Sequence, residues 1–121
     1  MLIFDDCDFD VAVQTALDAN FYTAGEVCSN ATRVFVQRSI ADKFIAAMVK
    51  KAENMVVGDP MAADVQMGAL ISAAHLSKVL DYVQIGVSEG AQIATGGIQV
   101  HPKGCENGNF MAPTIITNCH D

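Results

Sequence analysis

The sequence predicts an α/β fold in which helices pack on a mainly parallel sheet. Short apolar runs rich in β-branched residues alternate with longer segments whose apolar residues recur every three or four positions. Acidic residues, glycines and prolines separate these segments. The 121 residues suffice for one domain with one hydrophobic core. Strands that alternate with helices are typical of a parallel sheet covered by helices.

Two strands and two helices are expected in the first part of the chain. The strands are predicted at 2–4 and 34–36, where apolar and β-branched residues cluster. Asp8 is placed to cap the first helix, whose predicted apolar face comprises Val11, Ala12, Ala16 and Leu17. Ser39 and Asp42 have the spacing of a capping box. The second helix follows, with an apolar face of Phe44, Ile45, Met48, Val49, Ala52 and Met55.

The second part of the chain begins where Gly58-Asp59-Pro60 stops that helix, and residues 61–71 are expected to be irregular. Ser72 caps a third helix and Gly90 closes it. The predicted apolar face of this helix comprises Leu76, Val79, Leu80, Val83 and Val87. A strand is predicted at 91–95, an exposed loop at 100–109 and a last strand at 114–117.

The composition limits the partners of the protein. The net charge of −7 argues against nucleic acid, because phosphates would be repelled. No apolar run approaches the roughly 20 residues that span a bilayer, and no export signal is visible, so a cytoplasmic, reducing setting is expected. Hydrophobic residues make up 51 % and charged residues 17 %. This apolar surplus predicts a covered surface, and we expect a homo-oligomer.

The stretch F-Y-T-A-G-E-V-C-S-N-A-T-R at 21–33 places a thiol between a predicted helix and a predicted strand. A cysteine nucleophile needs open space and backbone N–H groups directed at a developing oxyanion. Gly25 gives the backbone freedom, and the residues after Cys28 are small. The alternative is a buried structural cysteine in a tight connection. The four cysteines and three histidines are not spaced as metal ligands, and no metal site is predicted.

This stretch resembles the active-site cysteine motif of the aldehyde dehydrogenase superfamily. The residues that fit the motif are Phe21, Gly25, Glu26, Cys28, Ser29 and Asn30. The resemblance continues along the whole chain through L-I-F-D-D-C-D-F-D, G-D-P, M-G-A-L-I, E-G-A, G-G and A-P-T. Residues 27–37 and 117–121 are most similar to the betaine-aldehyde and 4-trimethylaminobutyraldehyde dehydrogenases.

The resemblance implies oxidation of an aldehyde to an acid with NAD or NADP. It implies that Cys28 is the nucleophile, that the backbone N–H of Cys28 is an oxyanion donor, and that three residues border the substrate tunnel: Tyr22, Val27 and Ser29. Glu26 is interpreted as structural or as part of a proton path, since the general base of the family belongs to an E-L-G-G-K type motif. His75 and Lys78 lie where the family contacts the ribose of its cofactor.

The resemblance also predicts that residues 1–121 are a partial, cysteine-bearing catalytic domain that lacks the Rossmann-like cofactor domain. The general-base motif, the second oxyanion donor and the nicotinamide-contacting segment are absent from the sequence. We therefore expect that this chain alone does not oxidise aldehydes.

Two other hypotheses remain open from the sequence. The first is a non-enzymatic, dimerising remnant or interaction module, which the apolar composition favours. The second is a small thiol or redox protein that uses Cys28 alone, which would need a base brought to the thiol by the fold, since no histidine is close to it in sequence.

Overall fold

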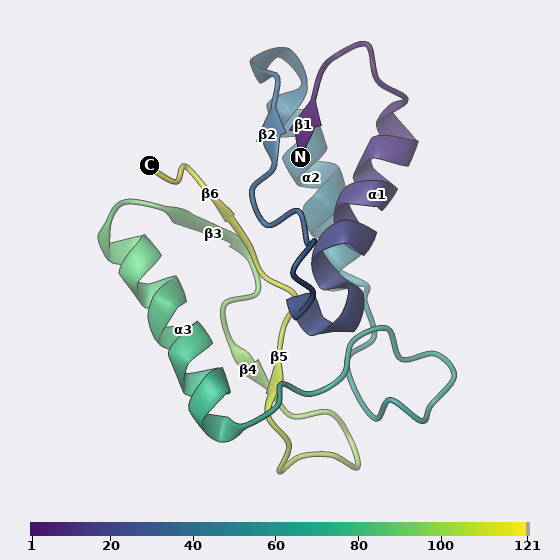
Figure 1. Ribbon diagram of the computed structural model, residues 1–121, viewed down its shortest axis with the longest axis vertical. Coiled ribbons are helices and arrows are strands. Elements are labelled where there is room, and N and C mark those ends of the chain that lie inside the picture. The colour runs from purple at the N-terminus through teal and green to yellow at the C-terminus, as the bar shows by residue number, and fades with distance from the viewer. Residues whose placement is uncertain (121) are drawn as a thin grey trace. The chain divides into compact units, whose positions relative to one another are not determined.

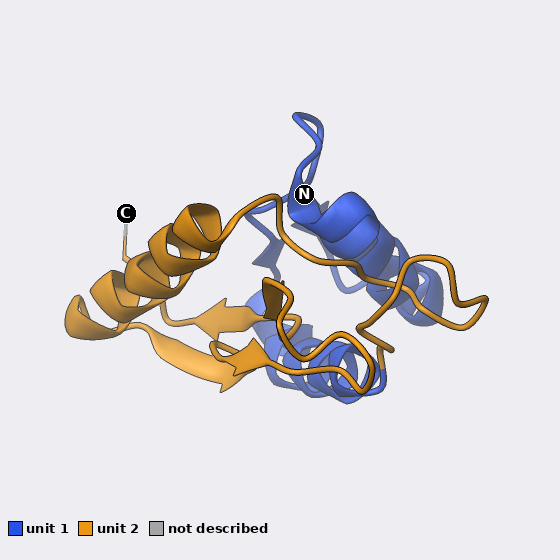
Figure 2. Cartoon of the chain, turned by 90° about the horizontal axis from the view of Figure 1, so that it is seen from below, with its two compact units in different colours: residues 1–54 blue, residues 55–121 orange. Residues whose placement is uncertain are grey.

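The computed structural model of the chain describes residues 1–120. The chain divides into two compact units, Met1–Asn54 and Met55–Asp121, coloured separately in Figure 2. The division falls just after the second helix, and the length of the chain did not indicate it. No helix in residues 1–120 is long and apolar enough to cross a membrane.

The first unit is a strand–helix–strand–helix arrangement (Figure 1). Its elements are β1 (Leu2–Ile3), α1 (Phe9–Phe21), the short 3₁₀ helix η1 (Tyr22–Gly25), β2 (Phe35–Val36) and α2 (Arg38–Glu53). The crossover through α1 makes β1 and β2 parallel, with Leu2 opposite Phe35. The helices pack on each other, and the rings of Phe9 and Phe44 meet edge to face at 6.0 Å. The buried residues of this unit are Ile3, Val13, Ala16, Leu17, Phe44, Met48 and Ala52.

The second unit combines one helix with two pairs of strands. Its elements are α3 (Ala73–Ser88), β3 (Gln92–Thr95), β4 (Gln99–Val100), β5 (Phe110–Met111) and β6 (Ile115–Thr117). The strands β3 and β6 pair antiparallel, as do β4 and β5. Leu76 and Val83 of α3 form a core cluster with Met111, against which Leu70, Val79, Leu80 and Ile116 pack.

The α/β class is confirmed, but the expectation of a mainly parallel sheet is wrong in this chain. The described residues form three separate two-stranded pairs, and only β1–β2 is parallel. A parallel pair needs a long crossover, and α1 supplies one. No helix lies between β3 and β6 in the described chain, so their strands return antiparallel. The predicted loop at 100–109 overlaps the end of β4 at Val100 and is followed directly by β5 at Phe110, and neither strand was predicted from the sequence.

The predicted helix caps and apolar faces agree with the structure only in part. Asp8 caps α1 by accepting a hydrogen bond from the Val11 amide at 3.2 Å, as predicted. The capping box at Ser39 is wrong: α2 starts at Arg38, its N-cap Gln37 makes no side-chain cap, and Ser39 lies in the first turn, where its hydroxyl donates to Asp5 at 2.9 Å. Two residues assigned to apolar faces, Val11 and Val87, are exposed.

Candidate functional site

The backbone reverses sharply just before Cys28. Helix α1 ends at Phe21, and three consecutive residues then take left-handed conformations, with φ of 52° at Thr23, 54° at Ala24 and 78° at Gly25. Glycine tolerates this region, whereas a β-branched residue such as threonine rarely enters it. The predicted freedom at Gly25 is confirmed, and the reversal extends over two further residues that the sequence did not reveal.

Cys28 lies in a tight turn on the surface. The Asn30 amide donates to the Val27 carbonyl oxygen at 3.0 Å, which closes a turn with Cys28 and Ser29 at its centre. Both of these central residues are exposed, and Val27 is half-buried. Within residues 1–120, the amides of Cys28 and Ser29 donate no hydrogen bond. Cys28 is therefore not the buried structural cysteine of the alternative reading.

The turn is fastened to the last turn of α1. The Ala31 amide donates to the Ala19 carbonyl oxygen at 3.1 Å, and Nδ2 of Asn30 donates to the Asn20 carbonyl oxygen at 3.2 Å. The side chain of Asn20 donates in turn to the carbonyl oxygen of Ala16, at 2.7 Å. In the sequence, Asn30 is one of the small residues after the thiol and fits the motif, and neither property predicts its contact with α1. The signal for its contact with α1 is weak, because the two asparagines are ten positions apart.

The three residues predicted to border a substrate tunnel all lie on this segment. Tyr22 directly follows α1 and is 71 % exposed, so ordinary packing does not occupy its ring. Val27 and Ser29 flank Cys28. The Glu26 side chain is exposed, and its amide donates to the Thr23 carbonyl oxygen at 3.2 Å.

The predicted cofactor contacts belong to the second unit. His75 is half-buried in the first turn of α3, where its amide donates to the Ser72 hydroxyl at 3.1 Å, which confirms Ser72 as the cap. Lys78 is exposed one turn later. A dinucleotide needs a cradle of backbone amides for its pyrophosphate as well as ribose contacts. Two side chains on one helix whose first turn is capped by its own serine do not make such a cradle, so these residues do not form a cofactor site by themselves.

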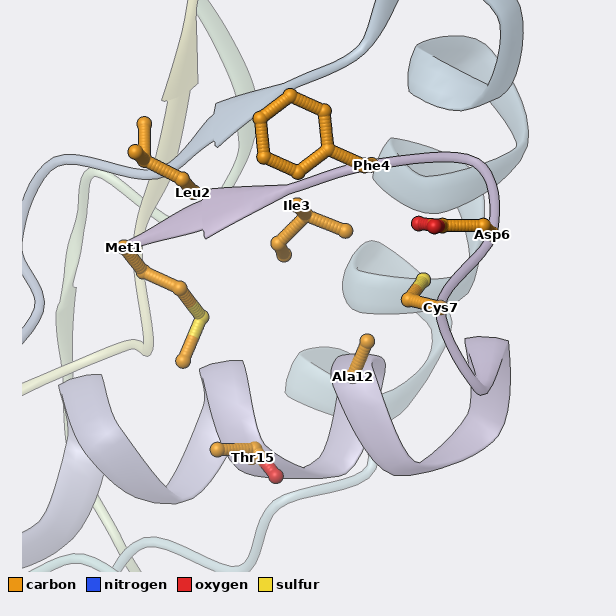
Figure 3. A pocket seen from close by; sticks show the side chains of 8 residues that line it. All are labelled: Met1, Leu2, Ile3, Phe4, Asp6, Cys7, Ala12 and Thr15. Carbon is orange, nitrogen blue, oxygen red and sulfur yellow. The ribbon is translucent and has the colours of Figure 1, made fainter.

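A shallow pocket of about 240 Å³ lies beside β1 (Figure 3). Met1 and Ile3 point toward the side of α1 that carries Ala12 and Thr15, and Cys7, in the loop after β1, also lines the pocket. Leu2 and Phe4 line the opposite side of the strand and are 69 % and 60 % exposed. None of the predicted site residues lines this pocket.

All four cysteines are unpaired, and only Cys28 and Cys119 are exposed. Among the residues that the structure describes, no three histidine, cysteine or acidic side chains are grouped to hold a metal ion. Within residues 1–120, the arrangement at Cys28 therefore offers a solvent-facing thiol and two unengaged amides, which is the chemistry of a nucleophile with an adjacent oxyanion donor.

Comparison with known proteins identifies the family to which this arrangement belongs. Residues 1–121 match the Aldehyde dehydrogenase family along their whole length. The chain belongs to the aldehyde dehydrogenase family. Its α/β fold matches part of an aldehyde dehydrogenase, the betaine aldehyde dehydrogenase of Staphylococcus aureus in complex with NAD⁺, with a TM-score of 0.95 and 41 % identity.

The aldehyde dehydrogenases that this chain matches are much longer than it is. The Vibrio vulnificus betaine aldehyde dehydrogenase is 48 % identical over 121 residues, and the Mus musculus 4-trimethylaminobutyraldehyde dehydrogenase is 47 % identical over 124 residues. Each alignment covers 100 % of this chain and 25 % of the relative. The structural match covers 98 % of this chain and 24 % of the Staphylococcus aureus enzyme. The chain thus spans about a quarter of the length of its relatives.

Proposed function

We propose that residues 1–121 are the cysteine-bearing part of the catalytic domain of an aldehyde dehydrogenase, with Cys28 as the nucleophile. The observation that carries this proposal is the exposed Cys28 at the centre of a turn whose two central amides are unengaged in the described chain. A thiol in that place is open to a carbonyl substrate. A BME-modified cysteine in the related Staphylococcus aureus enzyme supports a reactive thiol in this group of proteins.

The thiolate of Cys28 adds to the aldehyde carbon and forms a thiohemiacetal, in which the former carbonyl oxygen carries negative charge. The Cys28 amide is the proposed donor to that oxygen. Tyr22, Val27 and Ser29, on the same segment, border the path of the substrate. Water finally releases the acid from the thioester, and the cysteine is regenerated.

Oxidation of the thiohemiacetal to the thioester requires a hydride acceptor, which is NAD⁺ or NADP⁺ in this family. NAD⁺ is the cofactor in the related Staphylococcus aureus complex. His75 and Lys78 are proposed as minor contacts to the cofactor ribose. Because they form no cradle of their own, we propose that cofactor binding depends on a Rossmann-like domain and other parts of a whole enzyme, which residues 1–121 do not include.

Betaine aldehyde is the proposed substrate, since two of the most similar relatives are a betaine aldehyde dehydrogenase and a 4-trimethylaminobutyraldehyde dehydrogenase. Both names describe an aldehyde that carries a trimethylammonium group. An aromatic ring can bind such a cation through its face, and the exposed ring of Tyr22 is the candidate on this segment.

A chimera provides the decisive test. The matching 121 residues of the Vibrio vulnificus enzyme are replaced by this chain, and NADH formation with betaine aldehyde is measured. Activity is expected in the chimera, loss of it in Cys28→Ala, and retention in Cys119→Ala, which removes the other exposed thiol. A folded chimera that turns over without Cys28 would contradict the assignment of the nucleophile.

The chain alone is expected to form no NADH. Lack of a general base costs on the order of 10²–10⁴ in rate, and lack of one oxyanion donor costs about 10²–10³ more.

A second candidate function, a dimerising remnant, is favoured by the exposed Leu2, Phe4 and Phe35 along the β1–β2 pair. Light scattering coupled to size exclusion should reveal a homo-oligomer, and a monomer at all concentrations would argue against both self-association and this alternative.

A further inference from the structure

We propose that Asn30 is a positioning residue for Cys28, and that it acts by clamping the Cys28 turn to the carboxyl end of α1. This inference rests on the proposed role of Cys28 as the nucleophile. It concerns a residue that touches neither the thiol's substrate nor a cofactor, and that works through the backbone of the turn.

The clamp supplies hydrogen-bond donors to carbonyl groups at the end of α1. The last four carbonyl groups of a helix have no partner within the helix. The Asn20 carbonyl oxygen is one of these, and Nδ2 of Asn30 donates to it at 3.2 Å. The neighbouring Ala19 carbonyl oxygen receives the Ala31 amide at 3.1 Å. Two adjacent residues after the thiol thus bind two adjacent carbonyl groups of the helix.

Asn30 also closes the turn itself, because its amide donates to the Val27 carbonyl oxygen at 3.0 Å. One residue therefore fixes the turn internally through its backbone and externally through its side chain. Cys28 and Ser29 lie between these fixed points and make no hydrogen bond through their own amides in residues 1–120. Their orientation consequently depends on the residues on either side of them.

The segment before the turn adopts an unfavourable backbone conformation. Thr23 and Ala24 occupy left-handed conformations that are unfavourable for residues with a Cβ. Gly25 passes so close to the helix that an added Cβ would lie 3.3 Å from the Asn20 carbonyl oxygen. The chain before Cys28 therefore has an unfavourable backbone conformation, and the hydrogen bonds from the Asn30 side chain and the Ala31 amide to α1 hold the two ends of the segment together.

The test compares two substitutions in the 121-residue chain. Asn30→Asp keeps the size of the side chain but removes the N–H donor and adds a charge. Asn54→Asp is the matched control, because Nδ2 of Asn54 donates to the Lys50 carbonyl oxygen at 2.6 Å near the end of α2. Asn30→Gln retains the donor and tests for rescue.

Two measurements are made on each variant. Amide hydrogen exchange at Ala31 reports whether the turn stays on α1. Brief alkylation with iodoacetamide over a range of pH, read by mass spectrometry, gives the rate at Cys28 relative to the exposed Cys119. The half-buried Cys7 serves as a reporter of unfolding in the same unit.

In Asn30→Asp we expect exchange at Ala31 to accelerate about three- to tenfold, the range that corresponds to one lost hydrogen bond. The Cys28-to-Cys119 rate ratio should fall by a similar factor, because the amides near the sulfur no longer hold an orientation that favours the reacting thiolate. Cys7 labelling should not change, Asn54→Asp should behave as the unsubstituted chain, and Asn30→Gln should recover part of both effects.

Unchanged exchange at Ala31 would overturn the clamp. Faster exchange with an unchanged labelling ratio at every pH would overturn the positioning role. If Cys7 labelling rises in Asn30→Asp, the unit has unfolded, and Asn30→Gln then decides: a folded Gln variant with the unsubstituted exchange rate supports the clamp, and loss of folding there as well refutes a specific role. The proposed role of Cys28 as the nucleophile is tested independently of the clamp: it would be contradicted if Cys28 of the unsubstituted chain reacted no faster than Cys119.

Discussion

The close approach of two backbone segments in the second unit makes Gly96 a position that cannot hold a side chain without a backbone shift. Its φ is +76°, and a Cβ built at this position would overlap the carbonyl oxygen of Pro113 and lie 2.8 Å from the Cα of Thr114. These are backbone atoms, which cannot rotate away as a side chain can. We therefore expect Gly96→Ala to separate the end of β3 from the start of β6.

The magnitude follows from two contributions. A residue with a Cβ pays about 1–2 kcal/mol in the left-handed conformation. Relief of the overlap would also break the hydrogen bond from the Gly97 amide to the Thr114 hydroxyl at 2.9 Å, at a cost of about 1 kcal/mol. With the shifted β3–β6 contacts included, Gly96→Ala should lower the free energy of unfolding by roughly 3 kcal/mol or more.

Gly104 provides the matched control. Its φ is +84°, so alanine meets the same backbone strain, but no atom lies within 4 Å of the added Cβ. Gly104→Ala should therefore cost only about 1–2 kcal/mol. In a unit of this size the difference corresponds to roughly 10 °C in melting temperature. Thermal unfolding followed by circular dichroism measures both variants, and equal melting temperatures would refute the argument from backbone proximity.

Three further predictions concern the core, the thiols and the loop between β4 and β5. Phe44 is 2 % exposed, so Phe44→Asp should destabilise the first unit by several kcal/mol (about 3 or more), whereas Lys50→Gln on the exposed face should cost about 0.5 kcal/mol or less; comparable thermal melts would show that the buried face is wrong. Cys28 should be alkylated faster than the other three cysteines in a mass-spectrometric time course, since it combines exposure with nearby amides that are unengaged in the described chain. If another cysteine is labelled first at every pH, this prediction is wrong. The Glu106 carboxylate accepts hydrogen bonds from the Gly104 amide and from the Glu106 amide, and both lower its pKa from 4.5. The stabilisation that this carboxylate gives the loop is therefore present above pH 4.5 and is lost as the pH falls through the lower pKa of the folded state. An NMR titration midpoint at or above 4.5 would be inconsistent with this.

Local signals in the sequence were sufficient where the partner is a few residues away. Asp8 and Ser72 cap their helices because each side chain meets an amide three positions later. The capping box at Ser39 failed because α2 begins one residue earlier, and the Ser39 hydroxyl donates to a distant residue, Asp5. Asp5 also receives Nε2 of Gln37 at 2.7 Å, so it joins the end of β1 to the start of α2. A contact between residues more than 30 positions apart cannot be predicted from the spacing of neighbouring residues.

The pairing of the strands could not be predicted from the sequence, because it also depends on residues that are far apart in the chain. The strands β4 and β5 contain two residues each, too few for any alternation to be recognised. The direction of β3 against β6 depends on how the chain between them returns, and this intervening chain contains a second pair of strands instead of a helix.

The position of the thiol could be predicted from its motif, and the structure supplies a physical reason for that position. A helix end offers carbonyl groups that need donors. Asn30 and Ala31 satisfy two of them and so anchor the chain after the thiol. Cys28 and Ser29, between η1 and this anchor, belong to no strand or helix, and their amides are unengaged in the described chain. A boundary between a helix and a strand therefore provides both rigidity and open donors, which a nucleophile needs and the interior of either element cannot give.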